Sequence, residues 1–264
     1  MHEELSGVRI MAYTTIDDPS AYFHVNLHSG NETNNTDITF NANAGDFQPD
    51  WIWFKGRTSS AIDHALFDSS RGTTKILNSN NENAENAQGS TLKAFNSNGF
   101  RVGDDAGDYG VNKNGRTYVT WSWKCNGGTT SSFTESSNNP GGTIQTNTTA
   151  GFSIITTTGT GGAGTIAHGL GAVPHWIISK CRSNANTGWG VYHKKNTSEP
   201  ETELLGLASN GATLDSPSYY NDTAPTSSVF TVGTSNDING DGRTYVFYVF
   251  TEIQGYSKFG SYTG

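Results

Sequence analysis

The sequence predicts an all-β protein made of two tandem copies of an antiparallel, jelly-roll-like β-sandwich domain. Three observations support this fold class: a composition poor in helix formers, short apolar runs with strand periodicity, and motifs that occur twice in the same order. Of the 264 residues, 33% are hydrophobic, 15% are charged and 32 are Gly. Much of the remainder is Ser, Thr and Asn, which compete for backbone hydrogen bonds and disfavour helices. Six Trp, eleven Tyr and thirteen Phe suffice to fill β-sheet cores and argue against disorder.

Several segments have the residue pattern of strands. Residues 51–54 form a short apolar run, residues 151–158 are rich in β-branched side chains, and residues 118–123 alternate between apolar and polar side chains. Residues 245–250 are apolar on both faces, as expected for a strand that is buried on both sides or lies at an interface. Asn-Gly, Asp-Gly and Gly-Gly pairs separate the predicted strands at intervals of about ten residues, as turns do in a sandwich or jelly roll.

Three motifs occur twice in the same order, which indicates a tandem duplication. They are Pro-x-Trp-Ile-x-x-Lys-x-Arg at 49–57 and 174–182, Phe-x-Val-Gly at 100–103 and 230–233, and Gly-Arg-Thr-Tyr-Val at 115–119 and 242–246. The two occurrences of each motif lie about 125 to 130 residues apart. This spacing is too long for a solenoid repeat and suits an independently folding domain.

The repeats divide the chain into five predicted segments. Residues 1–12 are an N-terminal extension, residues 13–125 the first β-sandwich copy and residues 151–254 the second. Residues 126–150 form a Gly/Ser/Thr/Asn stretch that is typical of a flexible linker. Residues 255–264 resemble the start of the second copy and predict a strand-like segment. That segment either completes its own domain or pairs with an exposed strand edge of a neighbouring chain.

Charge and hydropathy exclude two classes of partner. The formal net charge is −8, and the 16 Lys and Arg residues are scattered, whereas a nucleic-acid-binding protein shows a basic patch. No apolar run approaches the roughly 20 residues that span a bilayer, so membrane insertion is not expected. Cys125 and Cys181 are too few for a disulfide framework. They are expected as free thiols, although the sequence leaves open whether they pair.

Two motifs that resemble functional sites are better explained by turns. His-Gly-Leu-Gly at 168–171 leads into a predicted strand, and the equivalent segment of the first copy contains no His, so we interpret His168 as part of a structural corner. Asp-x-Asn-x-Asp-Gly at 237–242 matches the start of a calcium-binding loop. It lacks the bidentate Glu of such a loop and runs into a strand, so we interpret it as a hairpin turn.

The sequence predicts no catalytic site. It contains no Gly-x-Ser-x-Gly, His-Glu-x-x-His or phosphate-binding-loop motif. None of its carboxylates lies in a motif that would fix the paired geometry of a glycosidase. We therefore predict no enzymatic activity, no cofactor and no bound metal ion.

Five residues are candidates for a ligand site or a subunit interface. Trp189, Tyr192 and His193 lie in one predicted strand. They belong either to the core or to a sugar-binding patch, because aromatic faces with nearby polar groups suit glycans. Phe247 and Val249 lie in the strand that is apolar on both faces, and are candidates for an interface between chains.

The motifs also resemble those of a known family. Ala-Tyr-Thr-Thr-Ile-Asp-Asp-Pro at 12–19, Phe-x-Pro-Asp-Trp-Ile-Trp at 47–53 and His-Ala-Leu-Phe-Asp at 64–68 resemble the repeated β domains of virion appendage proteins from phages of marine and cyanobacterial hosts. Ala-His-Gly-Leu-Gly-x-x-Pro at 167–174 is similar to the corner motif of many phage tail-fibre domains. The resemblance covers nearly the whole chain after Met11. Its motifs belong to the scaffold and mark no active site.

The resemblance implies a structural protein at the surface of a phage particle. We expect a tail fibre or tail-associated protein that binds a host-surface glycan and assembles as a homo-oligomer, with a homotrimer as the leading stoichiometry. Other virion proteins and the host glycan are its expected partners. One alternative is a head-decorating or head-fibre protein with a purely structural role, and another is a depolymerase of host polysaccharide. Tail or head location, host, ligand and stoichiometry stay open at this point.

Overall fold

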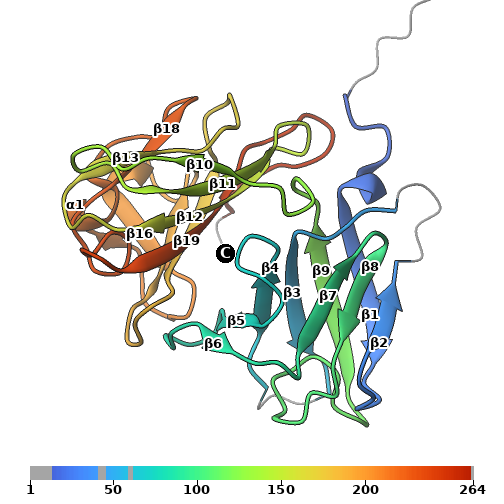
Figure 1. Ribbon diagram of the computed structural model, residues 1–264. Coiled ribbons are helices and arrows are strands. Elements are labelled where there is room, and N and C mark those ends of the chain that lie inside the picture. Colours follow the sequence, from blue (N-terminus) through green and yellow to red (C-terminus); the bar gives the residue numbers. More distant parts are fainter. Residues whose placement is uncertain (1–13, 41–45, 59–61, 263–264) are drawn as a thin grey trace, which may run out of the picture.

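The computed structural model describes residues 14–40, 46–58 and 62–262, and in this part of the chain it is all-β, as predicted. Figure 1 shows two lobes side by side, which we call the N-terminal half (residues 14–125) and the C-terminal half (residues 126–262). Every strand pairing in the four sheets is antiparallel. None of the described helices is long or apolar enough to cross a membrane.

Two sheets share one core in the N-terminal half. In spatial order the larger sheet consists of β1 (Phe23–Ser29), β9 (Thr117–Trp123), β3 (Trp51–Gly56), β4 (Ala65–Asp68), β5 (Lys75–Asn78) and β6 (Asn86–Ala87), and the smaller one of β2 (Thr36–Thr39), β8 (Gly99–Val102) and β7 (Leu92–Asn96). Side chains alternate along β3, so Ile52 and Phe54 point to the smaller sheet and pack with Phe100 of β8. We call this cluster the first core. A 3-10 turn, η1 (Pro19–Ala21), precedes β1.

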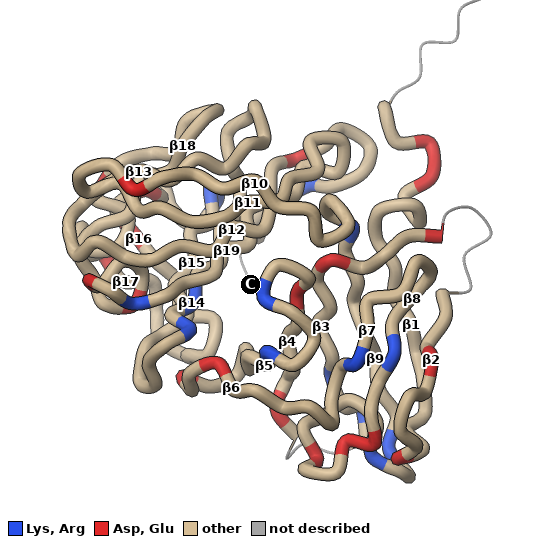
Figure 2. The backbone as a smooth tube through the Cα atoms, in the orientation of Figure 1, with Lys and Arg blue, Asp and Glu red and all other residues tan. Residues whose placement is uncertain are grey.

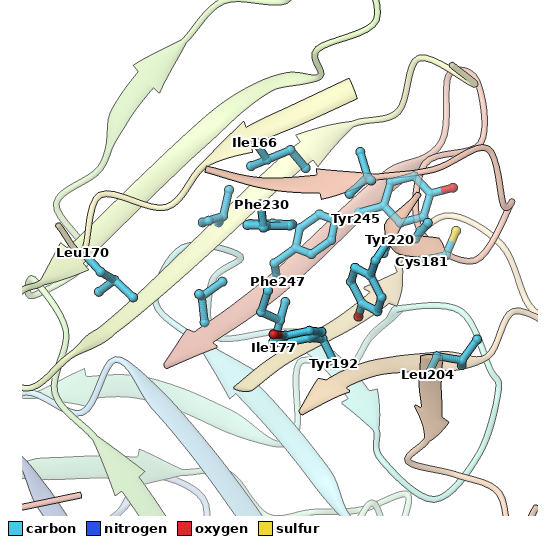
Figure 3. Packing of buried hydrophobic residues seen from close by; sticks show 14 residues of the cluster. Ile166, Leu170, Ile177, Cys181, Tyr192, Leu204, Tyr220, Phe230, Tyr245 and Phe247 are labelled. Carbon is cyan, nitrogen blue, oxygen red and sulfur yellow. The ribbon is translucent and has the colours of Figure 1, made fainter. Parts of the chain in front are cut away.

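The C-terminal half is built in the same way around a second core. In spatial order its larger sheet consists of β10 (Ser131–Phe133), β11 (Gly141–Asn147), β12 (Phe152–Thr158), β19 (Thr244–Phe250), β14 (Trp176–Cys181), β15 (Trp189–His193), β16 (Glu203–Gly206) and β17 (Leu214–Asp215). A two-stranded sheet of β13 (Gly164–Ala167) and β18 (Val229–Val232), a 3-10 turn η2 (Pro200–Thr202) and a short helix α1 (Pro217–Tyr220) complete this half. Figure 3 shows Ile166, Phe230 and Phe247 directed into this second core.

The same strand order and the same local hydrogen bonds occur in both halves. The order β1-β9-β3-β4-β5-β6 in one sheet corresponds to β12-β19-β14-β15-β16-β17 in the other. The Tyr118 hydroxyl accepts a hydrogen bond from the Lys113 N–H at 3.0 Å, and the Tyr245 hydroxyl accepts one from the Gly240 N–H at 2.6 Å. The repeated Gly-Arg-Thr-Tyr-Val motif therefore builds the same turn-to-strand geometry twice.

Residues 126–150 are part of the second large sheet, which corrects the prediction of a flexible linker. β11 pairs with β12 along its whole length, and Thr143 and Thr156 share a hydrogen bond across the pair at 2.7 Å. The start of this segment is fixed to the N-terminal half, because the buried Asp50 carboxylate accepts hydrogen bonds from the N–H groups of Cys125 (2.6 Å) and Gly127 (2.9 Å). Thr-rich runs are compatible with strands as well as with linkers, and here a neighbouring β edge decides the outcome.

The two large sheets pack against each other through their remaining faces. Trp51 is fully buried there, and its ring stacks on Tyr248 at 4.3 Å and on Trp123 at 4.4 Å between ring centroids. The buried members of this inter-half core are Trp51, Leu66, Leu77, Cys125, Phe152, Ile154, Ile178, Trp189, Val191, Val246, Tyr248 and Phe250. Both cysteines are free and buried, with Cys125 in the inter-half core and Cys181 in the second core.

A buried charged cluster joins the halves at a second point. Arg71 donates from Nε to Asp68 Oδ2 at 2.5 Å and from Nη1 to Glu85 Oε2 at 3.0 Å. From the C-terminal half, the Tyr248 hydroxyl donates to Asp68 Oδ2 at 2.7 Å, and Arg182 donates to both Glu85 oxygens at 2.8 and 3.0 Å. Because every charge in this cluster has an opposite partner, burial of the cluster is tolerated and fixes the halves relative to each other.

The C-terminal segment folds back onto its own chain. Residues 255–262 contain no strand, which corrects the strand-like prediction for the described part of this segment. The Tyr256 ring contacts that of Tyr22, and the Phe259 ring lies against Trp176 and Phe250. The aromatic residues of the segment are drawn to the junction between the halves, where they cover apolar surface.

Candidate binding site

Trp189, predicted as a ligand-site candidate, is a buried member of the inter-half core. Its side chain is 1% exposed, and its indole Nε1 donates to the carbonyl oxygens of Asn78 (3.0 Å) and Asn81 (3.1 Å) in the N-terminal half. A buried indole N–H usually has such a partner. The structure thus places Trp189 in the packing between the halves and not in a solvent-facing patch.

Three further candidates lie in the second core. Phe247 and Val249 are fully buried, and Tyr192 is 2% exposed, with burial raising the pKa of its hydroxyl to about 12. Figure 3 shows Phe247 and Tyr192 inside the cluster. The strand β19 is apolar on both faces because one face meets the second core and the other meets the inter-half core. This corrects the expectation that Phe247 and Val249 face another chain.

His193 is the one of the five candidates that reaches the surface. It is partly exposed at the end of β15, and its ring lies 6.5 Å from that of Phe259, measured between centroids. Burial lowers the pKa of His193. This residue therefore sits beside the C-terminal segment, which lines a surface depression.

That depression is an aromatic pocket at the junction of the halves, which we call the junction pocket. Its volume is about 330 Å³, and its lining comes from β1, β9, β14, β19, the turn before β12 and the C-terminal segment. The lining residues are Phe23, Trp123, Ala150, Trp176, Phe250, Tyr256, Ser257, Lys258 and Phe259. Phe23 lies 5.1 Å from Trp123, and Trp176 lies 5.2 Å from Phe250, between ring centroids.

A polar pocket of about 480 Å³ adjoins the junction pocket and shares Ser257 and Lys258 with it. His175 and Glu252 line this second pocket, with His175 Nε2 at 3.6 Å from Glu252 Oε2. Burial lowers the pKa of His175 even though the Glu252 charge acts in the opposite direction, so the imidazole is neutral near pH 7. Glu252 also accepts a hydrogen bond from the Phe259 N–H at 3.0 Å, which holds the backbone of this junction-pocket residue in place.

The turn motifs have structural roles, but residues 237–242 join β18 and β19 of two different sheets and do not form the predicted hairpin turn. His168 is buried, with Nε2 at 3.1 Å from the Thr226 carbonyl and Nδ1 accepting from the Leu170 N–H at 3.2 Å, which confirms the structural interpretation of this corner. Asn239 is buried and donates to the carbonyls of Gly162 (2.6 Å) and Gly233 (3.2 Å). Within the described residues, no three His, Cys, Asp or Glu side chains gather in a group suited to a metal ion.

The pocket residues carried only a weak signal in the sequence. Trp123 and Trp176 lie in recognisable strands, but a strand pattern does not reveal which apolar face stays uncovered. Phe259 lies in a segment whose position depends on long-range packing. Figure 2 shows that charges of both signs are dispersed over both halves, so no electrostatic feature marks the site either.

The amino-acid sequence matches a family model. A family described as a domain of unknown function, DUF7483, matches residues 18–264. The chain belongs to the DUF7483 family. The match runs through both halves, so the DUF7483 domain includes the inter-half core and the junction pocket. No curated protein and no solved structure matches the chain.

Proposed function

We propose that this DUF7483 chain is a virion-surface protein, part of a phage tail fibre or tail-associated structure, and that it binds a host-surface glycan at the junction pocket. The single observation that supports binding is the juxtaposition of an aromatic pocket with a polar one. The placement on a virion rests on the sequence motifs at 12–19, 47–53 and 167–174.

The chemistry of the two pockets suits a sugar. Trp123, Trp176 and Tyr256 line the junction pocket. The C–H faces of a pyranose pack on aromatic side chains, and the hydroxyl groups of the sugar need polar partners nearby. Ser257 and Lys258 belong to both pockets, and His175 follows in the polar one. A volume of about 330 Å³ lies at the lower end of the roughly 300–1,000 Å³ typical of ligand sites.

Binding without cleavage fits the carboxylates at this place. Glu252 is the acidic residue among those that line the two pockets, and it is engaged by His175 and by the Phe259 N–H. Hydrolysis of a glycosidic bond ordinarily requires two carboxyl groups roughly 5–10 Å apart. A single engaged carboxylate supports recognition of the ligand, not hydrolysis.

The proposal includes the origin of the fold. The corresponding strand orders and the equivalent hydroxyl contacts of Tyr118 and Tyr245 support two tandem copies of one β-sandwich domain. In this account the second copy carries the β10–β11 hairpin in addition, and the copies are fused through the inter-half core. The ligand pocket then arises from the fusion, since both copies contribute residues to it.

The test compares two tyrosines of the C-terminal segment. Wild-type protein is applied to an array of bacterial envelope polysaccharides, and the affinity for any glycan that it retains is measured by calorimetry. Tyr256→Ala removes a ring of the junction pocket and is expected to weaken binding about tenfold, the equivalent of 1.4 kcal/mol. Tyr262→Ala is the matched control, because Tyr262 is 95% exposed outside the pocket.

The outcomes separate the alternatives. Retention of no glycan by the wild-type protein contradicts glycan binding, and equal loss in both variants contradicts the pocket as its site. Release of reducing ends from a retained polysaccharide shows a depolymerase instead. Antibody labelling of intact particles tests the virion assignment separately, with label on the head supporting a decoration protein.

A further inference from the structure

The first strand of the N-terminal half is an unprotected sheet edge. β1 pairs with β9 in seven consecutive register positions without a bulge, and its other side has no strand partner among the described residues. Its sequence, Phe-His-Val-Asn-Leu-His-Ser at 23–29, contains no Lys, Arg, Asp, Glu or Pro. Edge strands that stay unpaired usually carry such residues or a bulge, because these features prevent association with another chain.

The sheet face beside this edge is apolar and open. Val25 is 47% and Leu27 60% exposed on β1. In register with Val25 lie Trp121 of β9 and Trp53 of β3, and the indole rings of Trp53, Trp121 and Trp123 line a groove of about 310 Å³. We call this surface the tryptophan face.

The tryptophan face is continuous with the inter-half core. The ring of Trp53 lies 5.7 Å from that of the fully buried Trp51, and 6.4 Å from that of Trp121. The C-terminal half covers the sheet over Trp51 but leaves Val25 and Leu27 in solvent. One apolar surface is therefore buried at one end and uncovered at the other.

The corresponding strand of the C-terminal half is paired on both sides. Its equivalent of β1 is β12, which pairs with β11 on one side and β19 on the other. Phe152 and Ile154 of β12, opposite Phe250 and Tyr248 of β19, are buried at 1% and 0% exposure. The same edge and the same face are thus paired and covered in one half, and open in the other.

We propose that β1 pairs with β1 of a second copy of this chain, antiparallel about a two-fold axis at Asn26, so that two tryptophan faces form one apolar surface. In this register Val25 of each copy lies opposite Leu27 of the other, and Phe23 lies opposite Ser29, so the apolar side chains of both copies share a face. Edge-to-edge pairing supplies main-chain hydrogen bonds, and an isologous contact closes after two subunits.

Two β1 strands can pair without electrostatic repulsion between their side chains. On the opposite face, His24 of one copy meets His28 of the other. Burial lowers the pKa of both imidazoles, so they are neutral near pH 7 and do not repel each other. A net charge of −8 opposes association of copies elsewhere on the surface, and β1 is a seven-residue segment free of that charge.

The test is the mass of the full-length protein in solution and the response of that mass to one charge. Light scattering is expected to give twice 28.3 kDa. Leu27→Lys is expected to weaken the dimer about 100-fold or more, because a charged side chain is then placed in an apolar contact. Leu214→Lys is the matched control, since Leu214 is 56% exposed on β17, at the edge of the other large sheet, and its dimer should persist.

Each outcome decides the proposal. A monomeric wild-type protein overturns it, and so does a mass of three times 28.3 kDa, which would fit the trimer expected from the sequence. A dimer that is equally stable in Leu27→Lys and wild type places the contact elsewhere. If the full chain is monomeric and dimerises only after deletion of residues 1–11, that segment and not a second copy occupies the edge. Circular dichroism confirms that each variant is folded, and glycan binding is not required for any of these results.

Discussion

Replacement of Trp51 by Ala tests whether the two halves unfold as one unit. The Trp51 side chain is fully buried, and its ring lies within 6 Å of four others besides that of Trp53, belonging to Tyr248, Trp123, Phe152 and Phe250. Truncation of a buried Trp costs about 3–5 kcal/mol, and the loss of several stacked pairs places this variant at the upper end. In a chain of this size about 5 kcal/mol corresponds to a fall in Tm of about 10–20 °C.

The assay is urea unfolding followed by far-ultraviolet circular dichroism, with Trp53→Ala as the comparison. Trp53 lies two residues further along the same face of β3 but is only half-buried, so its truncation should cost about 1–2 kcal/mol. The wild-type protein should unfold in one transition, because the inter-half core belongs to both halves. Two separate transitions in the wild-type protein, or a loss below about 1 kcal/mol in Trp51→Ala, would refute the reasoning.

Two further predictions concern the buried charged cluster. Arg71→Met leaves the Asp68 carboxylate buried without its cation and should destabilise the fold by about 3–5 kcal/mol in the same urea assay. A change in unfolding free energy near zero would show that the charged cluster does not stabilise the packing of the two halves. Glu85 supplies a pH dependence. Burial alone would raise the pKa of Glu85, but hydrogen bonds from Arg182 and the charge of Arg71 hold it below its ordinary value of 4.5. The stability from this depressed pKa is therefore present above pH 4.5 and is lost as the pH falls through the folded-state value. Between pH 6 and pH 3, the Tm of Glu85→Gln should fall less steeply with decreasing pH than that of the wild-type protein. Parallel plots of Tm against pH for the two proteins would show that Glu85 is not the source of this pH dependence.

The periodic and repeated features of the sequence predict the strands well. The alternation at residues 118–123 corresponds to β9, and the apolar run at 51–54 lies in β3. These predictions succeed because strand periodicity and paired motifs are local properties. The segment at 126–150 fails for the opposite reason. Its Gly, Ser and Thr residues permit either a linker or a strand, and the free edge of β12 selects the strand.

The candidate site could be predicted only in part, because burial depends on what each strand meets. Tyr192 and Phe247 are aromatic residues of the kind found at interfaces, yet both are buried within the second core. Trp123 has the same kind of pattern and lines the junction pocket. A side chain's position on a strand face follows from the sequence, whereas the partner of that face follows from tertiary packing.

Corresponding positions of the two large sheets differ in burial. Val25 lies opposite Trp121 in one half, and Ile154 lies opposite Tyr248 in the other. Ile154 and Tyr248 are buried by contact with the N-terminal half, whereas no described element covers Val25 to the same extent. The two sheets cover each other unequally: the C-terminal half covers Trp51 and Leu66 of the N-terminal sheet but leaves Val25 exposed. The proposed dimer accounts for the exposed part of this sheet, because in it a second molecule covers Val25 and Leu27.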